Sequence, residues 1–352
     1  MTARLPVPAA RAAAAAVLEA AGLAAPQAES VARRLVEGDL LGHRTHGLAQ
    51  LPTYLERIGD GRIATAGRIE VLHDGGAHFS WHTPRLPGAW VMEQLVAQAL
   101  ERSAAHAVVT ATLANCTHIG ALQAYLEDIG RRGLLALLMV TDPGVASVAP
   151  PGGADAVTTS NPIAACIPTG GDPVLIDQST TLASNGAIAQ HAAAGRRLPG
   201  RWLLDGQGVP TDDPAVMQAT PPGTLLPVGG ENFGYKGFAC GLLVEAFALA
   251  LSGFGHDLPR VRGAQGVFLQ IMAPAGFGGG ADAFLRATDA LVAQCHASRR
   301  IDPDRAVRLP GERALQSKRE QQRHGLLCDS GLLATLDGWA ARLGSARRFT
   351  AT

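Results

Sequence analysis

The stretch GHRTHGLAQL at residues 42–51 places two histidines, His43 and His46, three positions apart. Such a pair could bind a metal ion, supply an imidazole for proton transfer, or lie solvated at the start of a helix. A zinc site needs at least one more Cys, His or carboxylate, and the sequence offers no obvious partner for this pair. We therefore expect no metal here, while the choice between catalysis and a solvated pair stays open at this point.

A third histidine, His118, lies in a loop between an expected strand at 107–113 and an expected helix at 121–133. Together with a strand expected at 134–140, these segments form a βαβ-like unit. Loops that follow strands commonly carry the ligand-binding groups of α/β proteins. His118 is therefore a stronger candidate for chemistry than most of the eleven histidines in the chain.

The segment AGFGGGA at 275–281 fits the glycine pattern GxGxxG/A of dinucleotide-binding folds, through Gly276, Gly278 and Ala281. An expected strand precedes it and an expected helix follows it. Only about seventy residues remain after it, however, and they have helical patterns, whereas a dinucleotide-binding fold needs further parallel strands. We interpret the segment as a plain turn between a strand and a helix.

Lys236 follows a glycine-rich segment, GGENFGYKG, and opens an apolar helix. A lysine beside the amides of a helix N-terminus can bind a phosphate, although a solvated lysine shows the same pattern. Ser160 and Asp177 lie next to short apolar runs, in segments whose residue types are those of ordinary turns. None of these positions identifies a function by itself.

Positioning these residues requires a mixture of helices and strands. Apolar residues at helical spacing predict two helices within 7–41, on either side of Gly22, and alternation around Gly75 and Gly76 predicts two short strands. The segment 141–235 is rich in turns around short apolar runs, which is typical of backbone used for binding. The other expected elements are a short helix at 52–61, helices at 89–105, 234–253 and 282–297, a strand at 267–275, and mostly helix over 312–345.

Thirty Lys and Arg residues balance thirty Asp and Glu residues. No global field therefore attracts the protein to nucleic acid or an anionic membrane, and a small-molecule partner is expected.

No run of 18 uncharged apolar residues predicts a membrane span, and Arg11 and Glu19 interrupt the alanine-rich start, which indicates a helix rather than a signal peptide. Five widely spaced cysteines without a CxxC pair are typical of a reduced, cytoplasmic protein. At 352 residues, two lobes are expected.

Taken in order, the segments resemble one family, the malate/L-lactate dehydrogenases. The stretch THGLAQLPTYLERI resembles the SHG motif of that family, and the loop around His118 resembles its HxGA loop. Further segments match in order and spacing, namely TSNPIAACIPTGG, LIDQSTT, LDGQGVPTDDP, LLPVGGENFGYKG and RLPGERA. Singly these matches are weak, but together they are specific and span almost the whole chain.

The resemblance implies an α/β fold of the malate/L-lactate dehydrogenase type, with a helical N-terminal region and a non-Rossmann cofactor-binding domain. It also implies a homodimer and a nicotinamide cofactor, either NAD or NADP. The expected regions are a helical segment at 1–70 with the SHG-like motif, a cofactor-binding domain at about 71–245, and a C-terminal α/β segment at 246–352 that completes the catalytic and dimer lobe.

The resemblance further implies that His118 or His46 gives a proton to a carbonyl or imine, with Thr45 as a partner, while hydride comes from the cofactor. An imidazole that titrates near neutrality suits this task. Ser160 would lie near the substrate. The cofactor contacts implied by the resemblance are His118, Ile119, Gly120, Ala121, Leu122, Thr141, Ile176, Asp177, Gln178, Lys236, Pro310, Gly311 and Glu312.

Three departures from the family pattern concern the substrate. Thr45 replaces the serine of SHG and keeps a hydroxyl. Gln50 occupies the position of an arginine that grips the substrate carboxylate, and a neutral amide cannot make that charge-assisted pair. Ala187 stands where a charged residue is usual. We therefore expect an atypical or bulky substrate, with Arg44 or Arg85 as replacement anchors.

The sequence thus predicts an NAD(P)-dependent dehydrogenase or reductase that acts on CH–OH or C=N, with a substrate from secondary metabolism. One alternative is a cyclic imine (ketimine) reductase, which uses the same hydride geometry but protonates nitrogen. Another, motivated by the lost charges at 50 and 187, is an inactive relative that binds a cofactor or a partner protein. The substrate, the choice between NAD and NADP, and the identity of the proton donor stay open.

Overall fold

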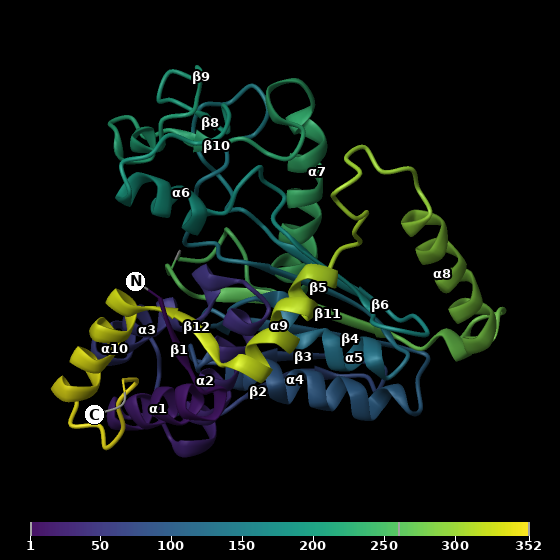
Figure 1. The fold of residues 1–352 in the computed structure, drawn as a ribbon, viewed down its shortest axis with the longest axis horizontal. Helices are drawn as coiled ribbons and strands as arrows, with labels where there is room; N and C mark the ends of the chain where they lie inside the picture. Colours follow the sequence, from purple (N-terminus) through teal and green to yellow (C-terminus); the bar gives the residue numbers. More distant parts are fainter. Residues whose placement is uncertain (1, 260, 351–352) are drawn as a thin grey trace.

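The computed structural model describes residues 2–259 and 261–350. A seven-stranded sheet with the order β2-β3-β4-β11-β5-β6-β7 runs through its centre (Figure 1). Among these strands the β3–β4 pair is parallel and the other pairs are antiparallel. The strand bounds are β2 Glu70–Asp74, β3 His78–His82, β4 Val108–Cys116, β5 Leu135–Thr141, β6 Ile163–Ile167, β7 Val174–Gln178 and β11 Gln265–Met272.

Ten described α-helices accompany the sheet, and most of those expected from hydrophobic spacing form where they were predicted. Gly22, with φ of 108°, joins the first two helices. The helix bounds are α1 Val7–Ala20, α2 Ala25–Leu40, α3 Leu51–Gly59, α4 Gly88–Ser103, α5 Glu127–Arg131, α6 Asn185–Ala193, α7 Gly230–Ala248, α8 Gly280–His296, α9 Glu312–His324 and α10 Ser330–Arg342.

Strand β11 lies between the two strands that flank the His118 loop. Both β4 and β5 pair with β11 in antiparallel orientation, so they are parallel to each other but not adjacent. The βαβ-like unit predicted at 107–140 thus forms with β11 inserted between its two strands, and its helix forms as two short pieces, 122–125 and 127–131. Because β11 is antiparallel to both neighbours, the 275–281 segment is not the first turn of a parallel dinucleotide-binding unit, and the plain turn before α8 is confirmed.

The two faces of the sheet are covered by different helices. Side chains of β5 alternate between the faces. Leu138 lies in a core formed with α4, α5 and α9, whereas Met139 packs with Phe268 and with Val244 of α7. Helices α4, α5 and α9 therefore cover one face, and α7 lies against the other.

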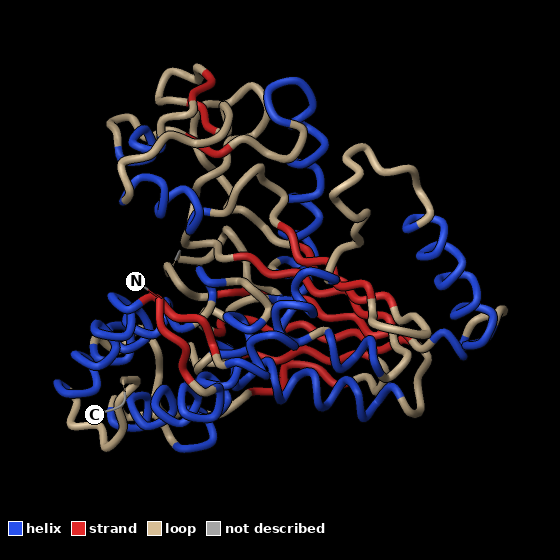
Figure 2. Tube along the Cα trace, viewed as in Figure 1, coloured by secondary structure: helices blue, strands red, loops and turns tan. Residues whose placement is uncertain are grey.

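The two ends of the chain share a second hydrophobic core. Strands β1 (Thr2–Leu5) and β12 (Leu326–Asp329) pair antiparallel, and their apolar residues pack with α1, α2, α3 and α10. Both termini lie in this group of helices (Figure 2). Sequence patterning predicts neither short strand, and 326–329 falls within the segment 312–345, which was expected to be mostly helix and is so apart from this strand. The region boundaries at 70 and 245 stay a prediction, but the segment 1–70 packs directly on the last elements of the chain.

A small lobe stands apart from the sheet and is connected to it by α7 (Figure 1). It contains α6 and three two-residue strands, β8 (Leu203–Leu204), β9 (Pro210–Thr211) and β10 (Thr224–Leu225), around its own small core. The lobe and strands β6 and β7 come from the segment 141–235. That segment, expected as loops around short apolar runs, thus supplies two sheet strands as well as the lobe.

Helix α7 and its short extension, Gly230–Ser252, are long and apolar enough to cross a membrane by length and composition. Within the fold, however, this helix packs on the sheet. Glu245 in its interior accepts hydrogen bonds from Thr141 Oγ1 at 3.1 Å and Asn161 Nδ2 at 2.7 Å. The opposite face, including Leu242 and Leu243, is exposed.

Candidate active site

The loop that carries His118 is fixed from two sides. Thr117 Oγ1 accepts from the Gly88 N–H at 2.9 Å, and the Ile119 N–H donates to Gln265 Oε1 at 3.0 Å. A Cβ on Gly88 would overlap the Thr117 carbonyl oxygen, so α4 begins directly against the loop backbone. These contacts tie the loop to α4 and β11 and hold the imidazole in place.

Tyr54 of α3 is the hydrogen-bonding partner of His118. Its hydroxyl oxygen lies 2.6 Å from His118 Nδ1 and 3.4 Å from the His118 carbonyl oxygen. The hydroxyl can therefore donate to an unprotonated Nδ1, or accept from Nδ1–H while it donates to the carbonyl, and only the second arrangement leaves Nε2 of a neutral ring free to accept a proton. Burial raises the pKa of Tyr54 well above its usual value, so the phenol keeps its proton. Tyr54 thus suits both protonation states of His118.

The surroundings of His118 favour the neutral imidazole. Burial, reinforced by His46 and by the positive charge of Arg57, lowers the pKa of His118 to about 3. The ring of His46 stacks beside it, with the ring centroids 5.6 Å apart and the planes 25° from parallel. Burial also lowers the pKa of His46, although Asp177 opposes the shift. Two imidazoles that favour the uncharged form therefore share one site.

Asp39 at the end of α2 supports the turn that carries His46. Its Oδ2 accepts from the Leu48 N–H at 2.8 Å, and a Cβ on Gly47 would overlap the carboxylate. The glycine of the THG segment is therefore required by the close approach of Asp39. Burial raises the pKa of Asp39 to about 7, although the Leu48 hydrogen bond and the Arg44 charge act in the opposite direction.

Thr45 and Gln50 complete this turn. Thr45 Oγ1 lies 2.9 Å from His46 Nδ1, so the threonine makes the hydroxyl contact predicted for it. Gln50 Nε2 donates to the Thr45 carbonyl oxygen at 2.6 Å. The amide that replaces the expected arginine is thus already engaged in holding the turn.

His118, His46, Thr45 and Gln50 line a cavity of ≈ 310 Å³, called the catalytic cavity below. Its charged lining residues are Arg57, Asp142 and Arg262, none of which the sequence had suggested. Ser160, predicted near the substrate, does line this cavity. The full lining consists of Thr45, His46, Gln50, Arg57, His118, Gly120, Leu122, Val140, Thr141, Asp142, Val145, Thr159, Ser160, Pro162, Ser184, Asn185, Gly186, Arg262, Gly263 and Gln265.

A second cavity of ≈ 760 Å³ is lined by the same two chain segments as the first, because Arg44 and Gln123 line it while their neighbours in sequence, Thr45 and Leu122, line the catalytic cavity. The end of β7 and the loop before α9 form its other walls. Its lining consists of Asp39, Leu41, Gly42, His43, Arg44, Gln123, Leu175, Ile176, Asp177, Gln178, Pro310, Gly311, Arg313, Ala314, Ser317 and Gln321.

The predicted cofactor contacts divide between these two cavities, with four exceptions. His118, Gly120, Leu122 and Thr141 line the catalytic cavity, and Ile176, Asp177, Gln178, Pro310 and Gly311 line the second. Ile119 and Ala121 are buried behind the loop. Glu312 is bonded to His296 and to the Leu309 N–H. Lys236 is exposed on α7, above the ring of Phe233, and lines neither cavity.

The two arginines predicted as replacement anchors do not line the catalytic cavity. Arg44 lines the second cavity. Arg85 lies outside both, in the left-handed region with φ of 58°, and its Nη2 is 3.4 Å from the Gly61 carbonyl oxygen. Arg44 is directed to the second cavity because the short helix η1 (Arg44–His46) turns the chain there, so that the next residue, Thr45, lines the catalytic cavity instead.

The side chain of His43 contacts Gln123 and does not pair with His46. Its Nε2 lies 2.8 Å from Gln123 Oε1 and 3.9 Å from Asp177 Oδ2. Within residues 2–259 and 261–350, no three His, Cys, Asp or Glu side chains group in a way that could hold a metal ion. His43 therefore belongs to the wall of the second cavity.

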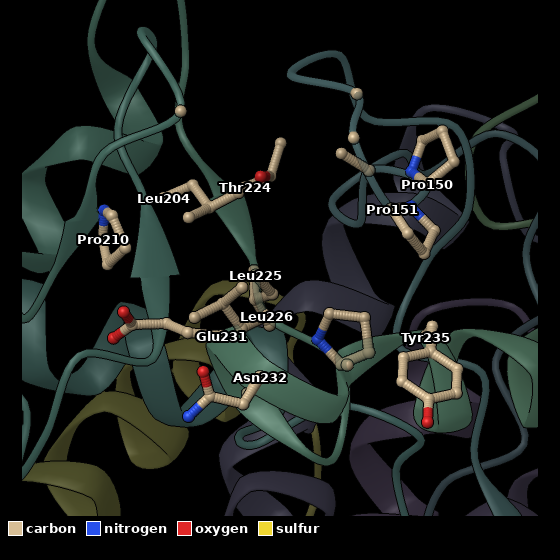
Figure 3. Close-up of a pocket in the computed structure, with 17 residues that line it drawn as sticks. Pro150, Pro151, Leu204, Pro210, Thr224, Leu225, Leu226, Glu231, Asn232 and Tyr235 are labelled. Atoms are coloured by element: carbon tan, nitrogen blue, oxygen red, sulfur yellow. The ribbon is translucent and has the colours of Figure 1, made fainter.

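A third cavity, of ≈ 320 Å³, lies between the small lobe and the start of α7 (Figure 3). Pro150, Pro151 and Tyr235 border one side of it, and Leu204 and Pro210 border the other. Its lining contains neither histidine nor lysine nor arginine. His118 and His46, the two histidines of the catalytic cavity, therefore do not line this one.

Replacing Asp39 by asparagine tests its burial through the pH dependence of stability. The pKa of Asp39 rises from the ordinary 3.8 to about 7 on folding, so ionisation favours the unfolded chain and stability is lost as pH rises from about 4 through 7. Asparagine keeps an acceptor for Leu48 and does not ionise. We expect the gain in the free energy of unfolding of Asp39→Asn over wild type to be larger at pH 8 than at pH 4.5, measured by urea denaturation.

Asp60→Asn is the matched control, because Asp60 is exposed and its pKa is lowered by Arg62. Its effect should not grow in the same direction between pH 4.5 and pH 8. Equal stability changes for Asp39→Asn at both pH values would contradict the assignment.

Comparison with known proteins places this chain in a family. A family model described as malate/L-lactate dehydrogenase matches residues 5–337. The chain is 30% identical to the (2R)-3-sulfolactate dehydrogenase (NADP(+)) of Chromohalobacter salexigens, covering 87% of this chain and 89% of that one. It is also 30% identical to the Delta(1)-pyrroline-2-carboxylate/Delta(1)-piperideine-2-carboxylate reductase of Pseudomonas syringae pv. tomato, covering 81% of each.

The fold agrees with this assignment. A solved dehydrogenase from Sinorhizobium meliloti superposes with a TM-score of 0.84 at 29% identity, over 96% of this chain and 98% of that one. The expected α/β fold of the malate/L-lactate dehydrogenase type is thereby confirmed. The chain belongs to the malate/L-lactate dehydrogenase family and is an NAD(P)-dependent oxidoreductase.

Proposed function

We propose that the protein transfers hydride between NAD or NADP and a small 2-oxo or 2-hydroxy acid. The observation that supports this most strongly is the group formed by His118, Tyr54 and His46, which opens into a cavity beside a second, larger one. A proton-transfer group next to space for a large ligand is what carbonyl reduction or alcohol oxidation requires.

The second cavity suits a dinucleotide in its chemistry. Arg44 and Arg313 would balance the charge of a diphosphate, and Asp177 and Gln178 at the end of β7 offer hydrogen-bonding groups for a ribose. The bound cofactor supplies the hydride. Protein residues supply the rest, since the His118 loop faces the catalytic cavity where the nicotinamide end would meet the substrate.

His118 is the group that we assign to proton transfer. A neutral His118 accepts the hydroxyl proton of a hydroxy acid during oxidation, and a protonated His118 gives it back to a carbonyl oxygen during reduction. Tyr54 accommodates both states because its hydroxyl accepts from Nδ1–H and donates to the backbone carbonyl of His118 in each of them, which leaves Nε2 to take and return the proton. His46 stacks on the ring and is the second candidate for the same role.

The substrate we propose is small, whereas the neutral Gln50 had suggested an atypical or bulky one. The catalytic cavity, at ≈ 310 Å³, lies at the low end of the range of about 300–1,000 Å³ for ligand pockets. An origin in secondary metabolism stays a prediction.

Reduction of a cyclic imine is the second candidate function. One relative at 30% identity is named as a Delta(1)-pyrroline-2-carboxylate/Delta(1)-piperideine-2-carboxylate reductase, and the same imidazole can protonate a nitrogen.

An inactive, cofactor-binding relative is the remaining alternative. The hydrogen-bonded Tyr54–His118 pair argues against it, because a site without proton transfer does not need such a pair.

Histidine variants test the proposed chemistry. NADH and NADPH are first titrated by fluorescence, and the cofactor that binds more tightly is then used with 2-oxo acids, with and without amines. We expect turnover with wild type and a loss of about 10²-fold or more in kcat for His118→Gln, because general acid–base catalysis contributes that much. His46→Gln should show a similar loss if the two rings act together.

His106→Gln is the matched control, since this exposed histidine lines neither the catalytic nor the second cavity. Faster turnover of imines than of 2-oxo acids would select the second candidate function. Cofactor binding without any turnover on the panel would support the inactive alternative and overturn our proposal.

Tyr54→Phe tests the support of His118. The variant keeps the ring but removes the hydroxyl that lies 2.6 Å from Nδ1. We expect kcat to fall by about 10-fold while the KM for cofactor stays unchanged, since a hydrogen bond to a group that becomes charged is worth about 1.5–3 kcal/mol. Steady-state kinetics measure both parameters. An unchanged kcat in a folded variant would show that Tyr54 has only a packing role.

We also propose that the protein is a cytoplasmic homodimer that pairs through the exposed face of α7. Leu242 and Leu243 of α7 are 51% and 52% exposed, and Leu251 in the short helix that follows is 58% exposed. Exposed apolar side chains that lie together in this way mark interaction surfaces. All five cysteines are free, as suits a reducing compartment.

Leu243→Glu tests the dimer. A charge placed in an apolar interface carries a large desolvation cost, so the variant should be monomeric where the wild type has twice the mass, as measured by light scattering. Leu291→Glu on α8 is the control, because Leu291 is equally exposed at 59% but lies on another helix. A monomeric wild type, or a dimeric Leu243→Glu variant, would refute pairing through α7.

A further inference from the structure

Arg57 has an unusual place for a surface arginine. It lies three residues after Tyr54 on α3, so both side chains leave the same face of the helix. Tyr54 bonds the His118 ring, and Arg57 lines the cavity into which that ring opens. Arg57 is half-buried and makes no salt bridge with any residue in the described ranges 2–259 and 261–350, while nearby Asp60 pairs with Arg62.

The carboxylate in the same cavity, Asp142, feels the charge of Arg57 but forms no ion pair with it. Both oxygens of Asp142 are bound to backbone, with Oδ1 accepting from the Gly144 N–H at 2.9 Å and Oδ2 from the Gly263 N–H at 2.8 Å. The other charged residue of the lining is Arg262. With the two histidines neutral, the cavity therefore contains two guanidinium groups and one carboxylate that is already occupied.

The loop at Gly263 lies directly beside the guanidinium of Arg57. A Cβ added to Gly263 would lie 3.3 Å from Arg57 Nη1, so the glycine leaves the cationic group uncovered by a side chain. Gln50, on the other side of Tyr54, has its amide engaged with the Thr45 carbonyl oxygen. Among the residues of α3 and its N-terminal turn, Arg57 is thus the cation with donors available to a ligand in the cavity.

We propose that Arg57 binds the carboxylate of the substrate and is the residue that selects acids over their neutral analogues. The proposal rests on the function proposed above, a reaction on a 2-oxo or 2-hydroxy acid or on a cyclic imino acid. An arginine pairs with a carboxylate through two parallel hydrogen bonds, which fixes the orientation of the acid as well as its charge. Arg57 is seven residues beyond Gln50, about 10 Å along a helix axis, so the acid is held beside α3 and Gly263 rather than at Gln50.

This placement links substrate binding to proton transfer. The positive charge of Arg57 is one of the causes that lower the pKa of His118, after burial and His46. A carboxylate on Arg57 offsets that charge, so binding of the acid favours the protonated imidazole that reduction needs. The charged groups of the cavity that act with it are Asp142 and Arg262, and the neighbouring titratable groups are His46 and Tyr54.

The test compares a 2-oxo acid with its methyl ester, which has the same reacting carbonyl but no charge. We expect Arg57→Gln to raise the KM for the acid by about 10- to 100-fold, because a charge-assisted pair is lost. The KM for the ester should change by less than about 3-fold, so the preference for the acid disappears. Arg57→Lys keeps the charge without the planar fork and should recover part of the preference. Arg62→Gln, an exposed arginine a few residues further along, is the matched control and should leave both values unchanged.

A binding measurement separates this proposal from the proposed function. Oxamate is an anion that cannot accept hydride, and its affinity for the cofactor-loaded protein is measured by calorimetry for wild type, Arg57→Gln and Arg62→Gln. Weaker binding in Arg57→Gln alone supports the proposal, whether or not the wild type turns over any acid. If the wild type binds oxamate through Arg57 but reduces no oxo acid or imine, only the proposed function fails. Equal oxamate affinity and an unchanged preference for acid over ester in a folded Arg57→Gln variant would overturn the assignment of Arg57.

Discussion

The hydrogen bond between Tyr54 and His118 is the constraint on which the rest of the site depends. Tyr54 belongs to the core formed by the helices at the two ends of the chain, and the His118 loop continues a strand of the central sheet. A bond of 2.6 Å between these two cores holds only if both pack in a fixed relation. The pairing of β1 with β12 and the seating of α4 on the His118 loop through Gly88 serve that purpose, because each locks one partner of the bond.

The helices of this fold were the part that sequence patterning predicted best. Their apolar residues repeat at helical spacing, and this information is local. The position of β11 between β4 and β5 was not predictable in this way, because its pairing partners lie far away in the sequence. Strands β1 and β12, of four residues each, are too short for an alternating pattern to stand out, and the small lobe depends on turns rather than on period.

The same distinction applies to the site. The histidines and Thr45 were identified by motif, and the structure brings them together. Tyr54 was missed because an aromatic residue on the apolar face of a helix has the pattern of a core residue. Arg57 was missed because a charge near the end of a helix is usually solvated, and Asp39 for the same reason. These residues acquire their roles through contacts with segments far away in the sequence or folded back onto them, and the spacing of residues does not show which segments come into contact.

The electrostatics of the cavity follow from the same packing. Burial drives His118, His46 and Asp39 toward their uncharged forms, so the packing that positions these groups also removes their charge. Arg57 cannot lose its charge in this way, because a guanidinium stays protonated at any pH at which the protein folds. The cavity is therefore poised for an anion, and the charge that the anion brings is also what shifts His118 toward the protonated state. A neutral ligand of the same shape would fill the cavity without supplying that charge. The preference for an acid over its neutral analogue therefore arises from Arg57, whose guanidinium pairs with the carboxylate that the ligand brings.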